Sequence, residues 1–150
     1  MPSRRDLSYV GVQVLLFTLV AVDPLGVRWP VPPWLRTVSY VGAGACVVLG
    51  VLAVAQLGSS LTPWPSPRHG SDLVTTGMYA RARHPIYASL LWFGVCVSVA
   101  TGSPGRAMIT LALWLLFREK AKFEEAMLRE RYPGYDAYAK RVGRFGTLRS

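Results

Sequence analysis

The sequence predicts an all-α integral membrane protein: a bundle of four transmembrane helices, the last two forming a helical hairpin, followed by a cytoplasmic C-terminal helical extension. Three observations lead to this prediction. The 150 residues are 51% hydrophobic and only 17% charged, whereas an average soluble domain is about 25% charged. Four long runs contain no charged residue. The basic residues, 17 against 8 acidic ones, gather on one side of those runs.

The same composition excludes two other classes of protein. A disordered chain has low hydrophobicity, and a nucleic-acid-binding protein spreads its basic residues over a charged surface. Here apolar runs separate the basic residues, so we expect contact with membrane lipids and none with nucleic acid. The length fits a single membrane domain over residues 1–150, because a domain typically has about 100–200 residues.

The first two spans are predicted over about residues 7–22 and 38–57. A helix needs about 20 apolar residues to cross a bilayer, and the first run reaches this length with its flanking residues. The sequence Asp23-Pro24-Leu25-Gly26 ends the first run, and prolines prevent a helix before the second: Pro30, Pro32 and Pro33. No small-x-small cleavage site precedes Asp23, so we expect the first segment to be retained.

The third and fourth spans are predicted over about residues 86–102 and 105–118. The sequence Gly102-Ser103-Pro104-Gly105 makes a tight reversal between them, hence a hairpin. The helical pattern continues to Arg131 without Gly or Pro. A helix from Pro104 to Arg131 would be roughly 40 Å long at 1.5 Å per residue, and would carry its charged half out of the membrane.

The basic residues predict the orientation of the spans. With a cytoplasmic N-terminus, the cytoplasmic parts, which include a loop over 58–85 and a tail over 119–150, hold 14 of the 17 basic residues. The outer loops hold only Arg28, Arg36 and Arg106. Because basic residues favour the cytoplasmic side of a membrane, we expect both termini, the long loop and the active site to face the cytoplasm.

Small residues recur at four-residue spacing in the second span: Gly42, Cys46 and Gly50. Such spacing lets two helices approach closely. It permits a dimer and serves packing within the chain equally well, so the sequence leaves the oligomeric state open.

Two polar stretches on the cytoplasmic face are dense enough to carry chemistry, residues 71–87 and 118–144. In the first, Pro85 fits the first turn of a helix, which places Arg83 and His84 at the helix N-terminus. Free N–H groups and the helix dipole make this a good place for an anion. We expect no metal site, because the chain has only two histidines, His69 and His84, and no cysteine lies near either.

Each of these residues also has a structural interpretation. Basic side chains next to a span, such as Arg83, commonly anchor it, and tyrosines commonly lie at the membrane interface. Glu124 and Glu125 have basic neighbours at helical spacing on a solvated face. Those neighbours are Lys120, Lys122 and Arg129.

Together, the two stretches resemble a known superfamily. They read Leu73-Val74-x-x-Gly77-x-Tyr79-x-x-x-Arg83-His84-Pro85-x-Tyr87, then a hairpin, then Glu124-Glu125-x-x-Leu128 with Tyr132, Tyr135 and Tyr138. This pattern, over roughly residues 71–145, is similar to that of the isoprenylcysteine carboxyl methyltransferase and phospholipid N-methyltransferase superfamily. Its members are small integral membrane enzymes that use S-adenosylmethionine. The resemblance therefore implies a membrane methyltransferase that acts on a lipophilic small molecule or lipid.

The resemblance also implies roles for individual residues. It places Ser71, Asp72, Leu73 and Val74 in the lining of the cofactor pocket, and it makes the pocket walls from Tyr79, His84, Pro85, Ile86, Tyr87 and Glu124. Lys120 falls where prenylcysteine-type members are expected to have a substrate-binding arginine. A lysine there is a point charge and cannot make the bidentate contact that arginine makes.

The residue types suit the groups of this cofactor. Arg83 and His84 suit its carboxylate, Glu124 suits its ammonium or ribose hydroxyls, and tyrosine faces suit its sulfonium or adenine. Arg83, His84 and Glu125 are the candidate catalytic residues. Glu125 or His84 would act as a general base if the acceptor arrives protonated.

The identity of the acceptor stays open at this point, because an amine headgroup, a carboxylate and a thiol all accept methyl groups. A second hypothesis is that the chain is a non-catalytic membrane scaffold or partner subunit that keeps the fold. A small transporter is disfavoured, because no charged residue lies within an apolar core and transport pathways usually need one.

Overall fold

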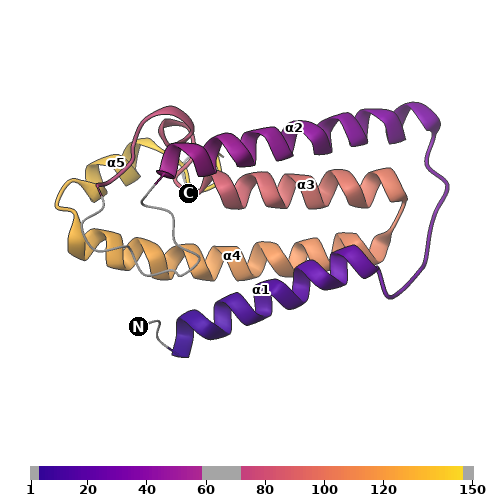
Figure 1. Ribbon diagram of the computed structural model, residues 1–150, viewed down its shortest axis with the longest axis horizontal. Helices are drawn as coiled ribbons and strands as arrows, with labels where there is room; N and C mark the ends of the chain where they lie inside the picture. The colour runs from indigo at the N-terminus through magenta and orange to yellow at the C-terminus, as the bar shows by residue number, and fades with distance from the viewer. Residues whose placement is uncertain (1–3, 59–71, 147–150) are drawn as a thin grey trace.

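The computed structural model describes residues 4–58 and 72–146, with side chains from residue 7 onward, and all regular structure in these ranges is helical. This confirms the predicted all-α class. The helices, drawn in Figure 1, are α1 (Arg4–Val22), α2 (Pro33–Leu57), the short 3-10 helix η2 (Gly77–Ala80), α3 (Pro85–Thr101), α4 (Pro104–Arg131) and α5 (Tyr135–Arg141).

The long helices lie side by side in a row (Figure 1). The hairpin of α3 and α4 occupies the middle, α2 packs on α3, and α1 packs on α4. α1 and α2 therefore flank the hairpin on opposite sides. η2 and α5 lie at the end of the row where α3 begins, so the polar motifs meet at this end.

The contact between α2 and α3 is close because small residues line it. A Cβ atom added at Gly42 would lie 3.1 Å from the Sγ atom of Cys96, and one added at Gly50 would lie 2.9 Å from the Oγ atom of Ser89. The glycines that recur along α2 therefore serve packing within the chain.

α2 is the one helix in the described ranges that is long and apolar enough to cross a membrane, with a mean hydropathy of 2.2. Leu7–Val22 and Pro85–Thr101 are shorter apolar helices. α2 begins at Pro33 and not near residue 38, so the prediction that Pro33 prevents a helix was wrong. Proline is tolerated in the first turn, where its missing N–H has no partner to lose. The count of four spans and their orientation stay predictions.

α4 joins the apolar and polar halves of the molecule, and its bounds agree with the helix predicted from Pro104 to Arg131. Its N-cap is Ser103, whose Oγ atom accepts a hydrogen bond from the backbone N–H of Arg106 (3.1 Å). Along the helix, the buried side chains change from Leu113 and Phe117 to Lys120 and Glu125. The first part of α4 therefore buries apolar side chains, whereas its later part buries charged ones.

At the other end of the hairpin, a buried carboxylate holds the connections together. Asp23 is 5% exposed, and it pairs with Arg28 (2.6 Å) and Arg106 (3.5 Å). It also accepts a hydrogen bond from the Ser103 hydroxyl (3.0 Å). These residues form the Asp23 cluster, which ties the end of α1 to the turn between α3 and α4.

The segment before α2 is bound to the same turn. The Trp29 N–H donates to the Gly102 carbonyl (3.0 Å). Gly102 has a φ of +61°, and a Cβ atom there would lie 2.2 Å from the Trp29 carbonyl oxygen. The glycine is therefore required both by its left-handed backbone and by this close approach.

Candidate active site

The start of α3 is held by a segment from the far end of the chain. His84 is the N-cap and Pro85 occupies the first turn, as predicted. The Arg83 N–H donates to the Gly143 carbonyl, and the His84 N–H donates to the Arg144 carbonyl, both at 2.9 Å. The sequence predicts free backbone N–H groups here for an anion. At Arg83 and His84, however, carbonyl groups of the C-terminal segment already accept hydrogen bonds from the backbone N–H groups.

His84 is buried between two carboxylates. Its Nδ1 atom lies 3.4 Å from Glu124 Oε2, and its Nε2 atom lies 3.2 Å from Glu125 Oε1. Burial alone lowers the pKa of an imidazole. The hydrogen bonds and charges of Glu124 and Glu125 outweigh this effect, so the pKa of His84 is raised. The raised pKa favours the protonated ring, which can donate to both carboxylates.

Glu125 is fully buried, with 0% of its surface exposed. Two nitrogens of Arg144 bind its two oxygens at 2.8 Å each, and Arg83 Nη2 lies 3.2 Å from Oε1. Burial raises the pKa of a carboxyl group, but Arg144, His84 and Arg83 together lower it more, so the pKa of Glu125 lies well below its usual value. The interpretation that placed Glu125 on a solvated helix face was therefore wrong. Glu125, Arg83, His84 and Arg144 form the Glu125 cluster.

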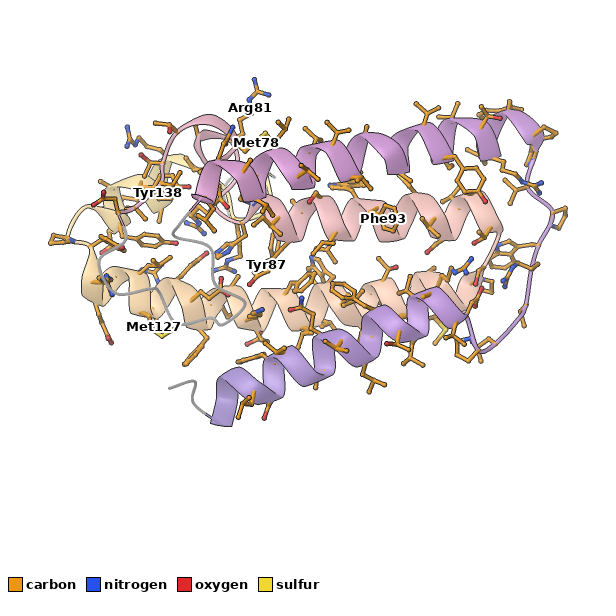
Figure 2. All side chains as sticks on the ribbon, in the orientation of Figure 1. Met78, Arg81, Tyr87, Phe93, Met127 and Tyr138 are labelled. Carbon is orange, nitrogen blue, oxygen red and sulfur yellow. The ribbon has the colours of Figure 1, made fainter. Side chains whose placement is uncertain are left out.

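Glu124 is the more open of the two carboxylates, with 16% of its side chain exposed. Its Oε1 atom accepts a hydrogen bond from the Tyr87 hydroxyl (2.5 Å). The Tyr87 ring stacks on Phe117, with centroids 4.5 Å apart, and lies parallel to the His84 ring at 5.4 Å. Figure 2 shows Tyr87 between α3 and α4. A partly open carboxylate beside aromatic faces can hold a cationic group.

Lys120 reaches the same aromatic ring. Its side chain is buried, and its Nζ atom lies 5.3 Å from the centroid of the Tyr87 ring. Nζ also donates to Oε1 of Gln13 on α1 (3.0 Å). The structure therefore brings the predicted substrate-binding residue next to Tyr87, and it adds α1, which lies outside the matched motifs, to the surroundings of the site.

The Gly-x-Tyr part of the motif docks η2 onto its neighbours. Gly77 has a φ of +60°, and a Cβ atom there would lie 2.5 Å from Oε1 of Gln56 on α2. The buried Tyr79 hydroxyl donates to the Ala53 carbonyl (3.4 Å), while the Tyr79 carbonyl accepts from the Tyr138 hydroxyl (2.6 Å). Burial, with a smaller effect of Tyr138, raises the pKa of Tyr79 to about 12. Tyr79 thus links α2, η2 and α5.

The remaining residues of the predicted cofactor pocket lie around this core. Asp72 is exposed, whereas Leu73, Val74 and Ile86 are half-buried. Ser71 lies outside the described residues. Contact of these residues with a cofactor stays a prediction.

Sequence reasoning missed the contribution of the C-terminal segment. Arg144 supplies the two shortest contacts to Glu125. The Phe145 ring lies 6.3 Å from the His84 ring and packs against the core formed by Leu91, Leu113 and Phe117. No periodic pattern follows α5, so the sequence offers no local signal for this return of the chain.

Comparisons with known proteins assign this region to one family. The profile of the isoprenylcysteine carboxyl methyltransferase (ICMT) family matches residues 41–130. A probable protein-S-isoprenylcysteine O-methyltransferase of Oryza sativa subsp. indica is 33% identical over 112 residues, which cover 70% of this chain and 59% of that protein. The protein-S-isoprenylcysteine O-methyltransferase of Saccharomyces cerevisiae is 29% identical over 127 residues, covering 74% of this chain and 53% of that protein.

One relative has a different kind of name. The nickel-cobalt-cadmium resistance protein NccN of Alcaligenes xylosoxydans xylosoxydans is 31% identical over 84 residues, which cover 53% of this chain and 38% of that protein.

Among solved structures, the eukaryotic intramembrane Ras methyltransferase ICMT matches with a TM-score of 0.69 and 25% identity, covering 97% of this chain and 53% of that one.

The chain thus spans between 53% and 59% of the length of the methyltransferases described above. The profile match contains the Arg-His-Pro-x-Tyr motif, the hairpin and the Glu124-Glu125 pair. Of the two enzyme groups that the motifs resemble, the comparisons support the carboxyl methyltransferases. On the sequence match, the fold and the assembled motifs, this chain belongs to the isoprenylcysteine carboxyl methyltransferase family.

Proposed function

We propose that this chain is a membrane methyltransferase that transfers a methyl group from S-adenosylmethionine to a carboxylate on a lipophilic acceptor. The observation that carries the proposal is that Tyr87 contacts Glu124 through its hydroxyl and Lys120 through its ring. The relatives named as protein-S-isoprenylcysteine O-methyltransferases support this reaction class.

The residues around Tyr87 fit a cationic donor and an anionic acceptor. When bound, S-adenosylmethionine supplies a methyl group on a positively charged sulfur. Glu124 offers a negative charge and the Tyr87 ring an aromatic face, and both attract a cation. Lys120, over the same ring, attracts an anion. Opposite charges around one side chain are suited to aligning two reactants, which supplies much of the catalysis in a displacement reaction.

The protonation of the site favours an acceptor that arrives as an anion. A general base has to accept a proton near the working pH. Glu125 is bonded on both oxygens and its pKa is lowered, whereas the pKa of His84 is raised, so neither candidate is suited to that task. A carboxylate with a pKa near 4 is already ionised at neutral pH. An ammonium group would first have to lose a proton.

A labelling experiment tests this proposal. Membranes that contain the protein are incubated with methyl-labelled S-adenosylmethionine and with one of two acceptors, an S-prenylated N-acylcysteine or phosphatidylethanolamine. We expect label in a base-labile methyl ester of the first acceptor and none in the second. Label that appears only in the amine lipid would contradict a carboxylate acceptor.

Glu124→Gln tests the cofactor side of the site. Removing this charge should weaken S-adenosylmethionine binding by about tenfold or more, because a hydrogen bond to a charged group contributes about 1.5–3 kcal/mol. Binding is measured by calorimetry on detergent-solubilised protein. Glu119→Gln on the same helix is the matched control, since its side chain is 56% exposed and pairs with Lys122. If Glu124→Gln binds the cofactor like the parent, Glu124 does not belong to the site.

A non-catalytic scaffold or partner subunit is the second candidate. It is favoured by the likeness to NccN, a relative not named as an enzyme, and by a lysine at position 120 where an arginine is expected. The two candidates separate on one measurement, because a scaffold does not need to bind S-adenosylmethionine at micromolar concentration.

A further inference from the structure

We propose that a second site, a basic cleft beside the Glu125 cluster, binds a phosphate group. The cleft encloses about 650 Å³ between the end of α4, α5 and the C-terminal segment. Its charged lining consists of Arg83, Arg129, Asp136, Lys140 and Arg144. Glu124 and Tyr87 do not line it, so the proposal does not depend on methyl transfer.

The charges around the cleft do not balance. Arg83 and Arg144 share the carboxylate of Glu125, and Arg129 pairs with Asp136 (3.0 Å). Lys140 is exposed, and no hydrogen bond or ion pair holds it within the described part of the chain. Four basic side chains thus face two carboxylates, and the excess positive charge attracts an anion.

A buried donor on a residue that lines the cleft also lacks an acceptor within the described part of the chain. The Arg83 side chain is 7% exposed; Nη1 donates to the Ala139 carbonyl (2.8 Å) and Nη2 pairs with Glu125, but Nε has no hydrogen-bond partner. Buried donors are nearly always satisfied in folded proteins. An unsatisfied donor on a residue that lines the cleft indicates that an acceptor belongs there.

A phosphate group meets these requirements better than a carboxylate does. It offers several acceptor oxygens in different directions, and arginine forks bind two of them at once. A single water occupies about 30 Å³ of liquid, so a cleft of about 650 Å³ has room for the molecule that carries the phosphate. That molecule is either a lipid with an anionic headgroup or a soluble phosphate compound.

The test uses the full chain, purified in a non-ionic detergent at fixed low salt. Three probes are titrated by calorimetry: inorganic phosphate, short-chain phosphatidic acid and short-chain phosphatidylcholine. We expect saturable binding of phosphatidic acid or inorganic phosphate and weaker binding of the zwitterionic lipid. Lys140→Ala should weaken the binding by about tenfold, the equivalent of one charge-assisted hydrogen bond, and Lys140→Arg should restore it.

Lys122→Ala is the matched control. It removes the same charge from α4, where Lys122 pairs with Glu119 (2.7 Å) and does not line the cleft. Since Lys140 is exposed, Lys140→Ala should keep the thermal midpoint of the parent, so lost binding will not reflect lost folding.

The affinities of the three probes distinguish the possible occupants of the cleft. Phosphatidic acid that binds more than tenfold tighter than inorganic phosphate supports a lipid headgroup as the occupant. Equal affinities support a soluble phosphate compound. The proposal is overturned if neither phosphate probe saturates, if phosphatidylcholine binds as tightly as phosphatidic acid, or if Lys122→Ala loses as much affinity as Lys140→Ala, which would indicate diffuse attraction to a basic surface.

Discussion

The two ends of the α3–α4 hairpin are built on the same arrangement, a buried carboxylate held by arginines. At one end, Asp23 pairs with Arg28 and Arg106. At the other, Glu125 pairs with Arg83 and Arg144 and, at 3.7 Å, with Arg129. Both carboxylates are at most 5% exposed. Ion-pair geometry alone therefore does not distinguish a structural end from a functional one.

The two ends differ in the polar groups that surround the buried carboxylate. In the Asp23 cluster, Arg106 also donates to the carbonyls of Val20 (2.9 Å) and Ala21 (3.3 Å), so its donors serve the connections between helices. The Glu125 cluster adds a histidine whose pKa is raised and a second carboxylate that is partly open. Each cluster also has one buried atom without a hydrogen-bond partner among the described residues, Oδ2 of Asp23 and Nε of Arg83. Groups with a shifted pKa gather at functional sites, so the raised pKa of His84 and the partly open Glu124 distinguish the two ends.

The largest expected effect is on stability, and it compares the two carboxylates directly. Glu125→Gln leaves Arg83 and Arg144 without a buried counter-charge, so we expect a loss of about 3 kcal/mol or more in unfolding free energy. Asp23→Asn keeps a side chain that tolerates the φ of 52°, and Arg28 is 42% exposed. We therefore expect about 1–2 kcal/mol for that change. Denaturant unfolding in detergent measures both, and equal losses would remove the distinction between the two ends.

The pH dependence of stability should belong to the Glu125 end. The pKa of His84 is raised on folding, so its contribution is fully present below about pH 6.5, the unfolded value, and is lost as the pH rises through the folded pKa. The pKa of Glu125 is lowered, so its contribution is present above its unfolded value and is lost as the pH falls through the folded pKa.

Unfolding midpoints from about pH 5 to about pH 9 check this sign. The parent should lose stability toward alkaline pH, and His84→Gln should flatten that decline. His69→Gln, which removes the other histidine, is the matched control. An alkaline decline that survives in His84→Gln would show that another group is responsible.

The smallest expected change in stability separates packing from cofactor binding. Tyr87→Phe keeps the stacked ring and removes the hydrogen bond to Glu124, and Tyr138→Phe removes a similar bond to the Tyr79 carbonyl. Each should cost about 1 kcal/mol of stability. Only Tyr87→Phe should weaken S-adenosylmethionine binding, severalfold by calorimetry. Equal weakening in Tyr138→Phe would shift the proposed site toward η2 and α5.

The sequence predicted the helices well because their boundaries are local. Proline at the first turn, glycine at the end of α3 and the uninterrupted pattern to Arg131 are all short-range signals. The structure also brings motif residues together, with His84 and Tyr87 against Glu124. The family resemblance implied only that these residues surround one cofactor pocket, and their roles there stay predictions.

The rest depended on long-range contacts that carry no periodic signal. Arg144 and Glu125 are separated in the sequence by a turn and α5, yet their side chains bond. The backbone hydrogen bond between His84 and Arg144 likewise joins residues from the two ends of the half that carries the motifs. The sequence around Asp23 predicts only a turn, and the pairing of Asp23 with Arg106 depends on how the hairpin packs against α1. Each of these pairs becomes adjacent only once the helices have assembled.

The row of helices also constrains the order of assembly during synthesis. α1 and α2 emerge from the ribosome first, but α1 packs on α4 and α2 packs on α3. Gln13 on α1 meets its partner Lys120 only after 107 further residues have been made. The α3–α4 hairpin therefore packs between two helices that are made before it. The contacts of α1 with α4 and of α2 with α3 form only once the half that carries the motifs has been made.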